Sequence, residues 1–215
     1  MTRASNTHQR RRQIAQALMN LMATEGYDGA TITAIAREAE LTSGLVHYHF
    51  RNKRRILLFM LDMILEEHHN SMTAALEHAG ERPWDQLDAL IDVHLAVGAD
   101  TDPRTTAAWV GLGAEALRNE EVREAYSSAL LMIAEQFREV LSFGRRLGAF
   151  AFDDLDTVIA AFMAIIQGYF NVAMTTRQLI PRGSAAGVTR QIARGLLSPQ
   201  ERNTASPHPS PKEPQ

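Results

Sequence analysis

The sequence predicts an all-α protein of about nine helices, and three observations support this fold class. Apolar residues recur at the 3.6-residue period of a helix in almost every segment, and no run shows the sustained alternation of a strand. Gly and Pro fall between the periodic segments, where helices begin and end. At 215 residues and 45% hydrophobic composition, the chain can bury a sizeable core in one or two domains.

The first predicted helix buries one apolar stripe and ends at Gly26, a residue type that commonly follows the C-terminus of a helix. The stripe consists of Ile14, Ala17, Leu18, Leu21 and Met22. Segment 31–55, TITAIAREAELTSGLVHYHFRNKRR, then predicts two short helices joined by a tight turn. The buried face of the first consists of Ile32, Ile35, Ala36, Ala39 and Leu41. We expect Thr33 to cap this helix and Thr42 to cap the next.

The second short helix is about two turns long and rich in small and polar side chains, so it buries little. Its polar or small residues are Ser43, Gly44, His47, Tyr48 and His49. Leu45 or Val46, together with Phe50, is expected to anchor it to the core. Such a helix is suited to the major groove of DNA, where its N-terminal residues contact base edges.

Two clusters of cations support DNA binding. Residues 51–55 contain Arg51, Lys53, Arg54 and Arg55 where a long helix begins, and Arg10, Arg11 and Arg12 lie at the expected start of the first helix. Helix N-termini favour anions by roughly 0.3 to 1 kcal/mol each, so both placements oppose the helix dipole. Contact with DNA phosphates explains them.

The charge of the chain is divided unevenly along its length. Residues 1–55 carry nine Arg or Lys and four Asp or Glu, a net charge of +5, whereas the whole chain carries −3. The other 160 residues therefore carry −8. A basic end joined to an acidic body is expected of a DNA-binding domain attached to a second domain.

Six more helices are predicted after the two short ones. The fourth helix runs from about Lys53 toward Ala79 and links the basic and acidic regions, and Gly80 to Pro83 then breaks the chain. The expected bounds of the others are about 87–95, 103–117, 119–148, 153–178 and 186–197. The tail from Ser198 holds five of the eight prolines, which predicts disorder. We therefore expect a helix-turn-helix domain over residues 1–52, a second helical domain over 53–197 and a disordered tail over 198–215.

Several classes of protein are disfavoured by composition. The absence of cysteine excludes disulfides and thiolate chemistry and fits a cytoplasmic location. The N-terminus has no apolar segment typical of a secretory signal. The longest apolar run, 158–174, contains Gln167 and Asn171 and is shorter than an ordinary membrane span, so we expect a buried helix and no membrane partner.

No metal site, catalytic residue or cofactor is predicted. His68 and His69 are adjacent and His47 and His49 are two apart, so neither pair shares a helix face as ligands spaced i, i+4 would. The sequence shows no Gly-rich phosphate loop and no nucleophile beside a base, and GLG at 111–113 is expected to serve helix packing. A helical adaptor or enzyme that carries a helix-turn-helix is the alternative class.

Five features of segment 14–57 occur together, in order and spacing: the Gly26 turn, Thr31, the Ile-Ala pair at 35–36, the run 42–50 and Lys53. In these features the segment resembles the N-terminal domain of the TetR family of transcriptional regulators, and GLVHYHF is similar to its BetI-like branch. The resemblance implies a homodimer through the eighth and ninth helices that binds a palindromic double-stranded DNA operator. It also implies a C-terminal domain that binds a small-molecule effector and then releases DNA, most often as a repressor.

The resemblance also implies residue roles. It puts Thr33, Tyr48 and Lys53 on backbone phosphates and the first half of the recognition helix near the groove floor. With the basic and capping residues added, the predicted DNA-binding residues are Arg10, Thr33, Thr42, Ser43, Gly44, Leu45, Tyr48, His49 and Lys53. Gly44 also permits close approach because it has no Cβ. The alternative for Tyr48 is a packed aromatic side chain, and His47 is expected to face the domain interior or a neighbouring helix.

One position departs from the family pattern. The family usually has glycine in the turn after the second helix, where this chain has Glu40. If the turn requires a positive φ, Glu40 costs roughly 1 to 2 kcal/mol, and its charge opposes DNA. Replacing it with glycine is then expected to stabilise the domain or to tighten DNA binding.

The effector site is predicted from aromatic and polar residues on facing helices. His94 lies on the apolar face of the fifth helix, and Glu115 lies between Trp109 and Tyr126. With Phe137 these residues predict a pocket with an aromatic wall and one carboxylate, which suits a cation through an attraction of ~0.5 to 2 kcal/mol. A hydrogen-bonded core histidine and a solvated glutamate are the alternative, and an anionic or neutral effector stays open.

Gln167 and Asn171 lie on one face of the eighth helix at spacing i, i+4. We expect these two side chains either to line the effector pocket or to pair with their copies across the dimer interface. The dimer is favoured because a stripe of small residues on the same helix, Ala160, Ala164 and Gly168, permits close approach. The sequence does not identify the effector, the operator sequence or the regulated genes.

Overall fold

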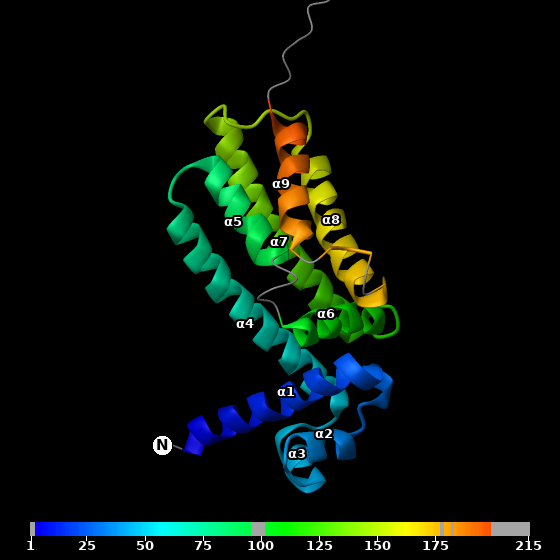
Figure 1. The fold of residues 1–215 in the computed structure, drawn as a ribbon. Helices are drawn as coiled ribbons and strands as arrows, with labels where there is room; N and C mark the ends of the chain where they lie inside the picture. Colours follow the sequence, from blue (N-terminus) through cyan, green and yellow to red (C-terminus); the bar gives the residue numbers. More distant parts are fainter. Residues whose placement is uncertain (1–2, 96–101, 177–178, 182, 199–215) are drawn as a thin grey trace, which may run out of the picture.

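The computed structural model describes residues 3–95, 102–176, 179–181 and 183–198, and every regular element in these ranges is an α-helix (Figure 1). The helices are α1 (Arg3–Gly29), α2 (Ile32–Glu38), α3 (Ser43–His49), α4 (Lys53–Ala79), α5 (Pro83–Leu95), α6 (Pro103–Ala116), α7 (Glu120–Arg146), α8 (Leu155–Thr176) and α9 (Ser184–Leu197). The predicted all-α fold is confirmed. Apart from Ser198, the tail predicted to be disordered lies outside the described residues, as does the expected end of α8 at Gln178.

Helices α1, α2 and α3 form a small unit at one end of the molecule (Figure 1). Its interior is apolar and combines residues from all three helices with Phe50, which follows α3. These residues are Ile14, Leu18, Ile35, Ala36, Val46 and Phe50. The packing of the two short helices α2 and α3 against α1 agrees with the helix-turn-helix predicted from the apolar periodicity.

Two details of this unit differ from the predictions. Thr31, and not Thr33, caps α2, because its hydroxyl accepts a hydrogen bond from the Ala34 amide at 3.1 Å. Thr33 lies inside the first turn and is exposed. Helix α1 begins at Arg3, so Arg10 and its two neighbours lie beyond its first turn, where the helix dipole has little effect. The dipole argument was therefore wrong for that cluster.

The turn after α2 requires a positive φ, as predicted. Glu40 has φ of 54° and is the one non-glycine residue in the described ranges with a positive φ. The Leu41 amide donates to the Ala36 carbonyl at 2.8 Å and the Glu40 amide donates to the Arg37 carbonyl at 3.0 Å. This pair of bonds is the Schellman motif, which places a left-handed residue directly after the helix.

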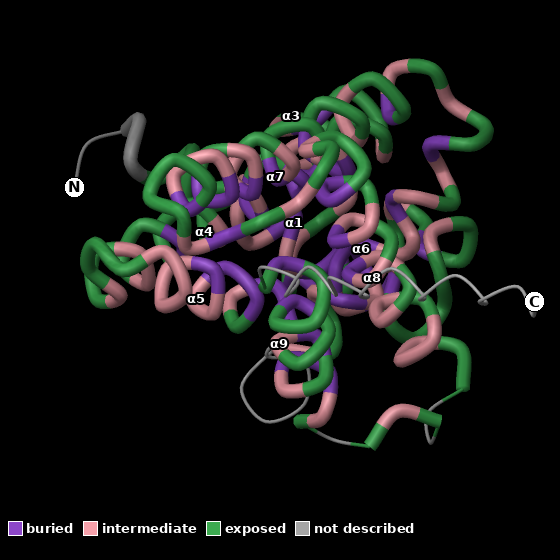
Figure 2. Tube along the Cα trace, turned by 90° about the horizontal axis from the view of Figure 1, so that it is seen from above, coloured by how far each residue is buried: buried purple, intermediate pink, exposed green. Residues whose placement is uncertain are grey.

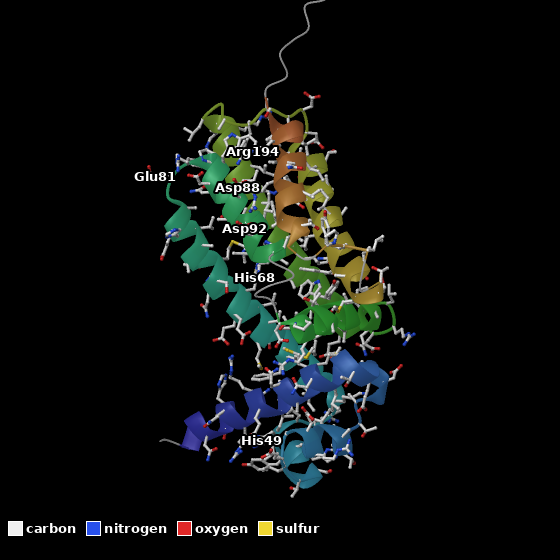
Figure 3. The ribbon with its side chains drawn as sticks, in the orientation of Figure 1. His49, His68, Glu81, Asp88, Asp92 and Arg194 are labelled. Carbon is white, nitrogen blue, oxygen red and sulfur yellow. The ribbon has the colours of Figure 1, made fainter. Side chains whose placement is uncertain are left out.

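Helix α4 links the small unit to the other helices, running along one side of the molecule from α3 toward α5 (Figure 1). Buried residues lie on the sides of the helices that face one another, and exposed residues turn outward (Figure 2). Helix α9 is held on α5 by Arg194, which pairs with Asp88 at 2.5 Å and lies over the Trp84 ring at 4.0 Å (Figure 3). The buried core runs without interruption from α1 to α9.

Helix α6 packs closely against α1 because of Gly111. A Cβ atom at this position would lie 2.6 Å from Cε of Met22, which belongs to α1. Gly113 faces Tyr126 in the same way, with a Cβ position 3.2 Å from the phenol oxygen. The predicted packing role of these glycines is confirmed, and Gly111 brings α6 close to the N-terminal unit.

Helix α8 differs from the prediction in length and burial. It has 22 residues, and among the described helices it is the one long and apolar enough to cross a membrane, so the argument from a short run was wrong. Its buried side chains are Val158, Ile159, Phe162 and Ile166. The small residues Ala160, Ala164 and Gly168 face outward and are exposed. The helix is therefore buried on one side and not all round.

Candidate DNA-binding face and effector pocket

Helix α3 is positioned by a cap and an anchor. The Thr42 hydroxyl accepts from the Leu45 amide at 3.2 Å, as predicted for an N-cap. Val46 is fully buried and Phe50 is nearly so, hence Val46 is the anchor and Leu45 is only half-buried. Because residues spaced i, i+4 share one helix face, this anchoring turns the opposite face of α3 outward.

The outward face of α3 presents Tyr48, whose side chain is 74% exposed. The packed alternative for Tyr48 is therefore wrong. His47 is also exposed, which corrects the expectation that it faces the interior. Gly44 is exposed, and a Cβ atom at this position would lie 4.0 Å from Thr42 Oγ1, an ordinary van der Waals contact. His49 is half-buried beside Tyr48, the two ring centroids being 5.1 Å apart. These residues leave a polar surface that a DNA groove can approach.

The basic residues near α3 have two different environments. Arg10 is exposed and its guanidinium donates to Gln13 at 2.7 Å, while Arg11 lies over the rings of Phe50 and Phe59 at 4.7 and 4.4 Å. Burial, and then the nearby Arg11 and Arg10, lower the pKa of His49. The positive charge beside α3 therefore comes from Arg10 and Arg11 and not from His49.

Three other cations bind within the chain. Lys53 donates to the Tyr27 carbonyl at 2.6 Å and its ammonium lies 4.0 Å from the Tyr27 ring centre. Arg54 and Arg55 pair with Glu121 of α7 at 3.6 and 2.7 Å. The cations at the start of α4 thus have intramolecular partners, and phosphate contact is not needed to explain them. The Lys53 ammonium has three N–H donors, so it can contact a phosphate while it keeps its bond to the Tyr27 carbonyl.

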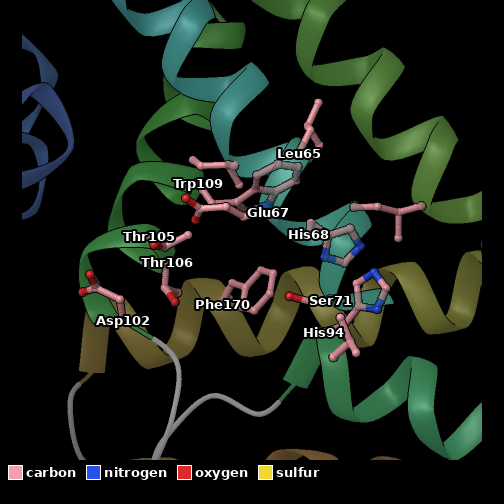
Figure 4. A pocket seen from close by; sticks show the side chains of 13 residues that line it. Leu65, Glu67, His68, Ser71, His94, Asp102, Thr105, Thr106, Trp109 and Phe170 are labelled. Carbon is pink, nitrogen blue, oxygen red and sulfur yellow. The ribbon is translucent and has the colours of Figure 1, made fainter. Parts of the chain in front are cut away.

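A cavity of about 350 Å³ lies between α4, α5, α6 and α8, and Ile133 of α7 completes its lining (Figure 4). Trp109 and Phe170 contribute aromatic walls, and Glu67 and Asp102 contribute carboxylates. His68 of α4 also lines the cavity. Its size is within the range of pockets for small ligands.

The histidines of the cavity are neutral. Burial, and then the neighbouring His68, lower the pKa of His94 to about 4, although the Leu90 carbonyl bonds Nδ1 at 2.8 Å. Burial likewise lowers the pKa of His68, whose ring centre is 4.6 Å from that of His94. A hydrogen bond from Arg104 holds the pKa of Asp102 low. Among the described residues that line the cavity, the charged groups at neutral pH are therefore carboxylates.

Two of the predicted effector residues, His94 and Trp109, line the cavity, and five do not. Phe137 is buried behind His94, with ring centres 5.5 Å apart. Glu115 instead lies toward the N-terminal unit and pairs with Arg118 at 4.0 Å, because α6 turns this residue toward α1. Asn171 is exposed and its amide donates to the Gln167 carbonyl of its own helix at 2.9 Å.

Gln167 occupies neither of the positions expected for it. Its side-chain oxygen accepts from the Trp109 indole at 3.1 Å and from the Tyr126 hydroxyl at 3.2 Å, so it lies inside the protomer, behind the aromatic wall. Gln167 and Tyr126 thus orient Trp109 and do not line the cavity. Gln167 and Asn171 also point to different surroundings, which the spacing i, i+4 did not predict.

Sequence reasoning missed Glu67, His68, Ser71, Asp102 and Phe170. In the sequence, the polar stretch of α4 is typical of a face exposed to solvent. Asp102 is typical of an N-cap before Pro103, and the structure shows that it has this role. Neither local sequence predicts that the carboxylates of Glu67 and Asp102 line the same cavity. In the part of the chain that the structure describes, no group of three or more His, Asp or Glu side chains is arranged to hold a metal ion.

Residues 14–59 match a family described as bacterial regulatory proteins, tetR family. The HTH-type transcriptional regulator BetI of Rhizobium meliloti is 29% identical over 161 residues, covering 75% of this chain and 76% of that regulator. The regulator of the same description from Agrobacterium fabrum is 33% identical over 115 residues, covering 53% of this chain and 54% of its own.

Solved structures show the same fold. A putative transcriptional regulator from Saccharomonospora viridis, in complex with choline, has a TM-score of 0.76 at 23% identity, covering 88% of this chain and 98% of that one. A TetR transcription regulator from Haloarcula marismortui has a TM-score of 0.77 at 22% identity, covering 89% and 100%. In sequence and fold, the helix-turn-helix and the helical domain beyond it are similar to those of known regulators.

Proposed function

We propose that this chain is a BetI-like regulator of the TetR family, and that it is a repressor whose homodimer binds a palindromic operator and is released by a small cationic effector. The observation that carries the proposal is an exposed recognition helix joined through α4 to a cavity with aromatic walls and two carboxylates. We assign DNA binding to residues 1–52 and effector binding and dimerisation to residues 53–197, in the cytoplasm.

DNA binding is supported by the exposed polar face of α3 and the basic residues around it. Tyr48 and Thr33 lie exposed on adjacent short helices, where hydroxyls reach backbone phosphates. Ser43, Gly44 and Leu45 lie in the first turn of α3, the part of a recognition helix that contacts base edges.

Dimerisation is supported by exposed apolar faces on α8 and α9. Val188, Ile192 and Leu196 follow one another at spacing i, i+4 on α9 and are 41 to 44% exposed. Ala160 and Gly168 belong to the small-residue stripe of α8, which is also exposed. Two such faces bury apolar surface when they pack against their copies, which favours a symmetric four-helix interface.

A cationic effector is supported by the chemistry of the cavity. The face of Trp109 attracts a quaternary ammonium, and Glu67 and Asp102 balance its charge. A structural neighbour was solved in complex with choline, a small quaternary ammonium that a cavity of this volume accommodates. We therefore propose choline or a closely related cation as the effector.

DNA binding is tested with the full chain and the DNA upstream of its own gene. We expect a footprint with two-fold symmetry, and an affinity that falls steeply with salt, because each phosphate neutralised by Lys or Arg releases counterions. Binding without symmetry, or without salt dependence, would argue for an adaptor and against an operator-bound dimer.

The effector is tested with a matched pair of probes. Choline and 3,3-dimethylbutan-1-ol have the same shape, but only choline is charged. We expect choline to bind by calorimetry and to weaken the operator complex, and the uncharged alcohol to do neither at the same concentration, because it lacks the attraction to Glu67, Asp102 and Trp109. Equal effects of the two probes would rule out a site selective for cations.

A further inference from the structure

Both carboxylates of the cavity are already bound by arginines. Glu67 Oε1 accepts from Arg12 Nη2 at 3.2 Å. Each oxygen of Asp102 accepts from Arg104 Nε at 2.9 Å, and Oδ2 also lies 2.7 Å from Nη2. A cation is therefore bound at each carboxylate in the absence of any effector, and an incoming cation meets occupied partners.

Both arginines also connect the cavity to the DNA-binding unit. Arg12 belongs to α1, and its Nη1 donates to Glu66 of α4 at 2.7 Å. Arg104 Nη1 donates to the Asn20 side chain of α1 at 3.1 Å, and Asn20 donates to Glu38 of α2 at 2.8 Å. Two polar links thus run from the cavity carboxylates to the helices that carry α3.

We propose that a cationic effector competes with Arg12 and Arg104 for Glu67 and Asp102, and that loss of these two arginine links loosens α1 and lowers the affinity for DNA. This inference rests on the proposed function, since it assumes a cation in the cavity and DNA at α3. It names the side chains through which occupancy of the cavity reaches the DNA-binding unit.

The ion pairs of Arg12 and Arg104 can be displaced by a cationic effector. The side chains of Arg12 and Glu67 are 34% and 63% exposed, and exposed ion pairs are weak, so a ligand can displace them. An ammonium group in the cavity attracts the same oxygens and repels the guanidinium, so the two cations compete for each carboxylate. By linkage, removing the arginine must then strengthen effector binding.

The first measurement is the affinity for choline, without DNA. Arg12→Met removes the guanidinium and leaves the cavity intact, and we expect it to bind choline several times more tightly than the wild type by calorimetry. Arg10→Met is the matched control, because Arg10 lies on the same helix but contacts Gln13. Its choline affinity should equal that of the wild type. Unchanged or weaker choline binding by Arg12→Met would overturn the competition.

The second measurement is the ratio of operator affinities without and with saturating choline. We expect choline to weaken the wild-type complex by about tenfold or more, a common size for such coupling. In the double variant Arg12→Met/Asn20→Ala, which lacks both links, the ratio should fall toward one. Arg10→Met should bind DNA less well but keep the wild-type ratio. Circular dichroism checks that each variant is folded.

The outcomes separate this inference from the proposed function. A double variant that choline releases from DNA by the same factor as the wild type overturns the role of the links and leaves the regulator with its effector intact. A wild type that binds its operator but does not respond to choline overturns the effector assignment and the inference together. A wild type that binds no upstream DNA contradicts the proposed function itself.

Discussion

Glu40 shows at the scale of one residue how the helix-turn-helix stores strain. The Schellman motif after α2 needs a left-handed residue, and glutamate occupies it with φ of 54°. Its Cβ then crowds the backbone, which costs roughly 1 to 2 kcal/mol relative to a relaxed residue. The side chain is exposed, so contacts with neighbours do not compensate this cost.

We expect Glu40→Gly to raise the free energy of unfolding by about 1 kcal/mol, because glycine adopts this φ without the Cβ penalty. Glu40→Ala is the matched control, since it removes the charge but keeps the Cβ. Chemical denaturation should show the gain for glycine and not for alanine, while operator affinity should rise for both if the carboxylate repels DNA. Equal stabilities of all three proteins would contradict the strain.

His94 makes the free energy of unfolding depend on pH, and the direction of this dependence follows from its lowered pKa. The unfolded imidazole takes up a proton near pH 6.5 and the folded one only near pH 4, so the unfolded state binds more protons between these values. The free energy of unfolding therefore falls as the pH decreases through this window. The same sign holds for His68, whose pKa is also lowered by burial.

His94→Gln should flatten this dependence, because glutamine keeps a polar side chain but does not titrate. We expect the wild type to lose up to about 3 kcal/mol between pH 6.5 and pH 4 through His94, and the variant to lose correspondingly less. Urea unfolding at a series of pH values measures both. His47→Gln, at an exposed histidine, serves as the control. If His94→Gln showed the same change of unfolding free energy with pH as the wild type, burial would not shift the titration of His94.

Among the elements, α3 depends most on its surroundings. A helix of seven residues is too short to be stable alone, so its position rests on the Thr42 cap and on the anchors Val46 and Phe50. These signals are local and were predictable from the sequence. The start of α1 was not, because residues 3–9 contain neither Gly nor Pro and lack an apolar stripe to mark a boundary.

Thr42→Ala tests the cap. Loss of the hydroxyl removes one of the two acceptors of the Leu45 amide, which also donates to the Thr42 carbonyl at 3.0 Å. This loss is expected to cost about 1 kcal/mol and to fray the first turn of α3. Since Ser43 and Gly44 lie in that turn, operator affinity should fall as well. Thr42→Ser keeps the oxygen and should behave like the wild type. A stable Thr42→Ala protein with unchanged DNA affinity would contradict this account of the recognition helix.

At the scale of the whole molecule, no described part of the protomer covers the outward faces of α8 and α9. Val188, Ile192 and Leu196 expose apolar surface, and α8 adds its stripe of small residues. The sequence showed the stripe but not its orientation, because the two polar residues Gln167 and Asn171 do not mark the solvent side: Gln167 faces the interior and Asn171 is exposed. The packing of Phe162 and Ile166 into the core settles which side of α8 faces outward.

If the proposed dimer forms through α8 and α9, Ile192→Asp should convert it to a monomer, because the substitution places a charge in the apolar face of α9. The monomer is expected to remain folded, since Ile192 is 44% exposed, but to bind the operator much more weakly. Sedimentation and operator titration measure the two effects. Leu117→Asp, at an exposed leucine outside α8 and α9, should change neither. If Ile192→Asp stayed dimeric, the apolar face of α9 would not be the dimer interface.

Features that depend on a few neighbouring residues followed from the sequence: the helices, the cap at Thr42, the positive φ at Glu40 and the polar face of α3. They could be predicted because periodicity, capping and backbone sterics act over one or two turns. The cavity could not. Its carboxylates lie 35 positions apart in the chain and are linked to α1 by two arginines, so their role arises from the packing of four helices and from charges that meet only in the folded protein.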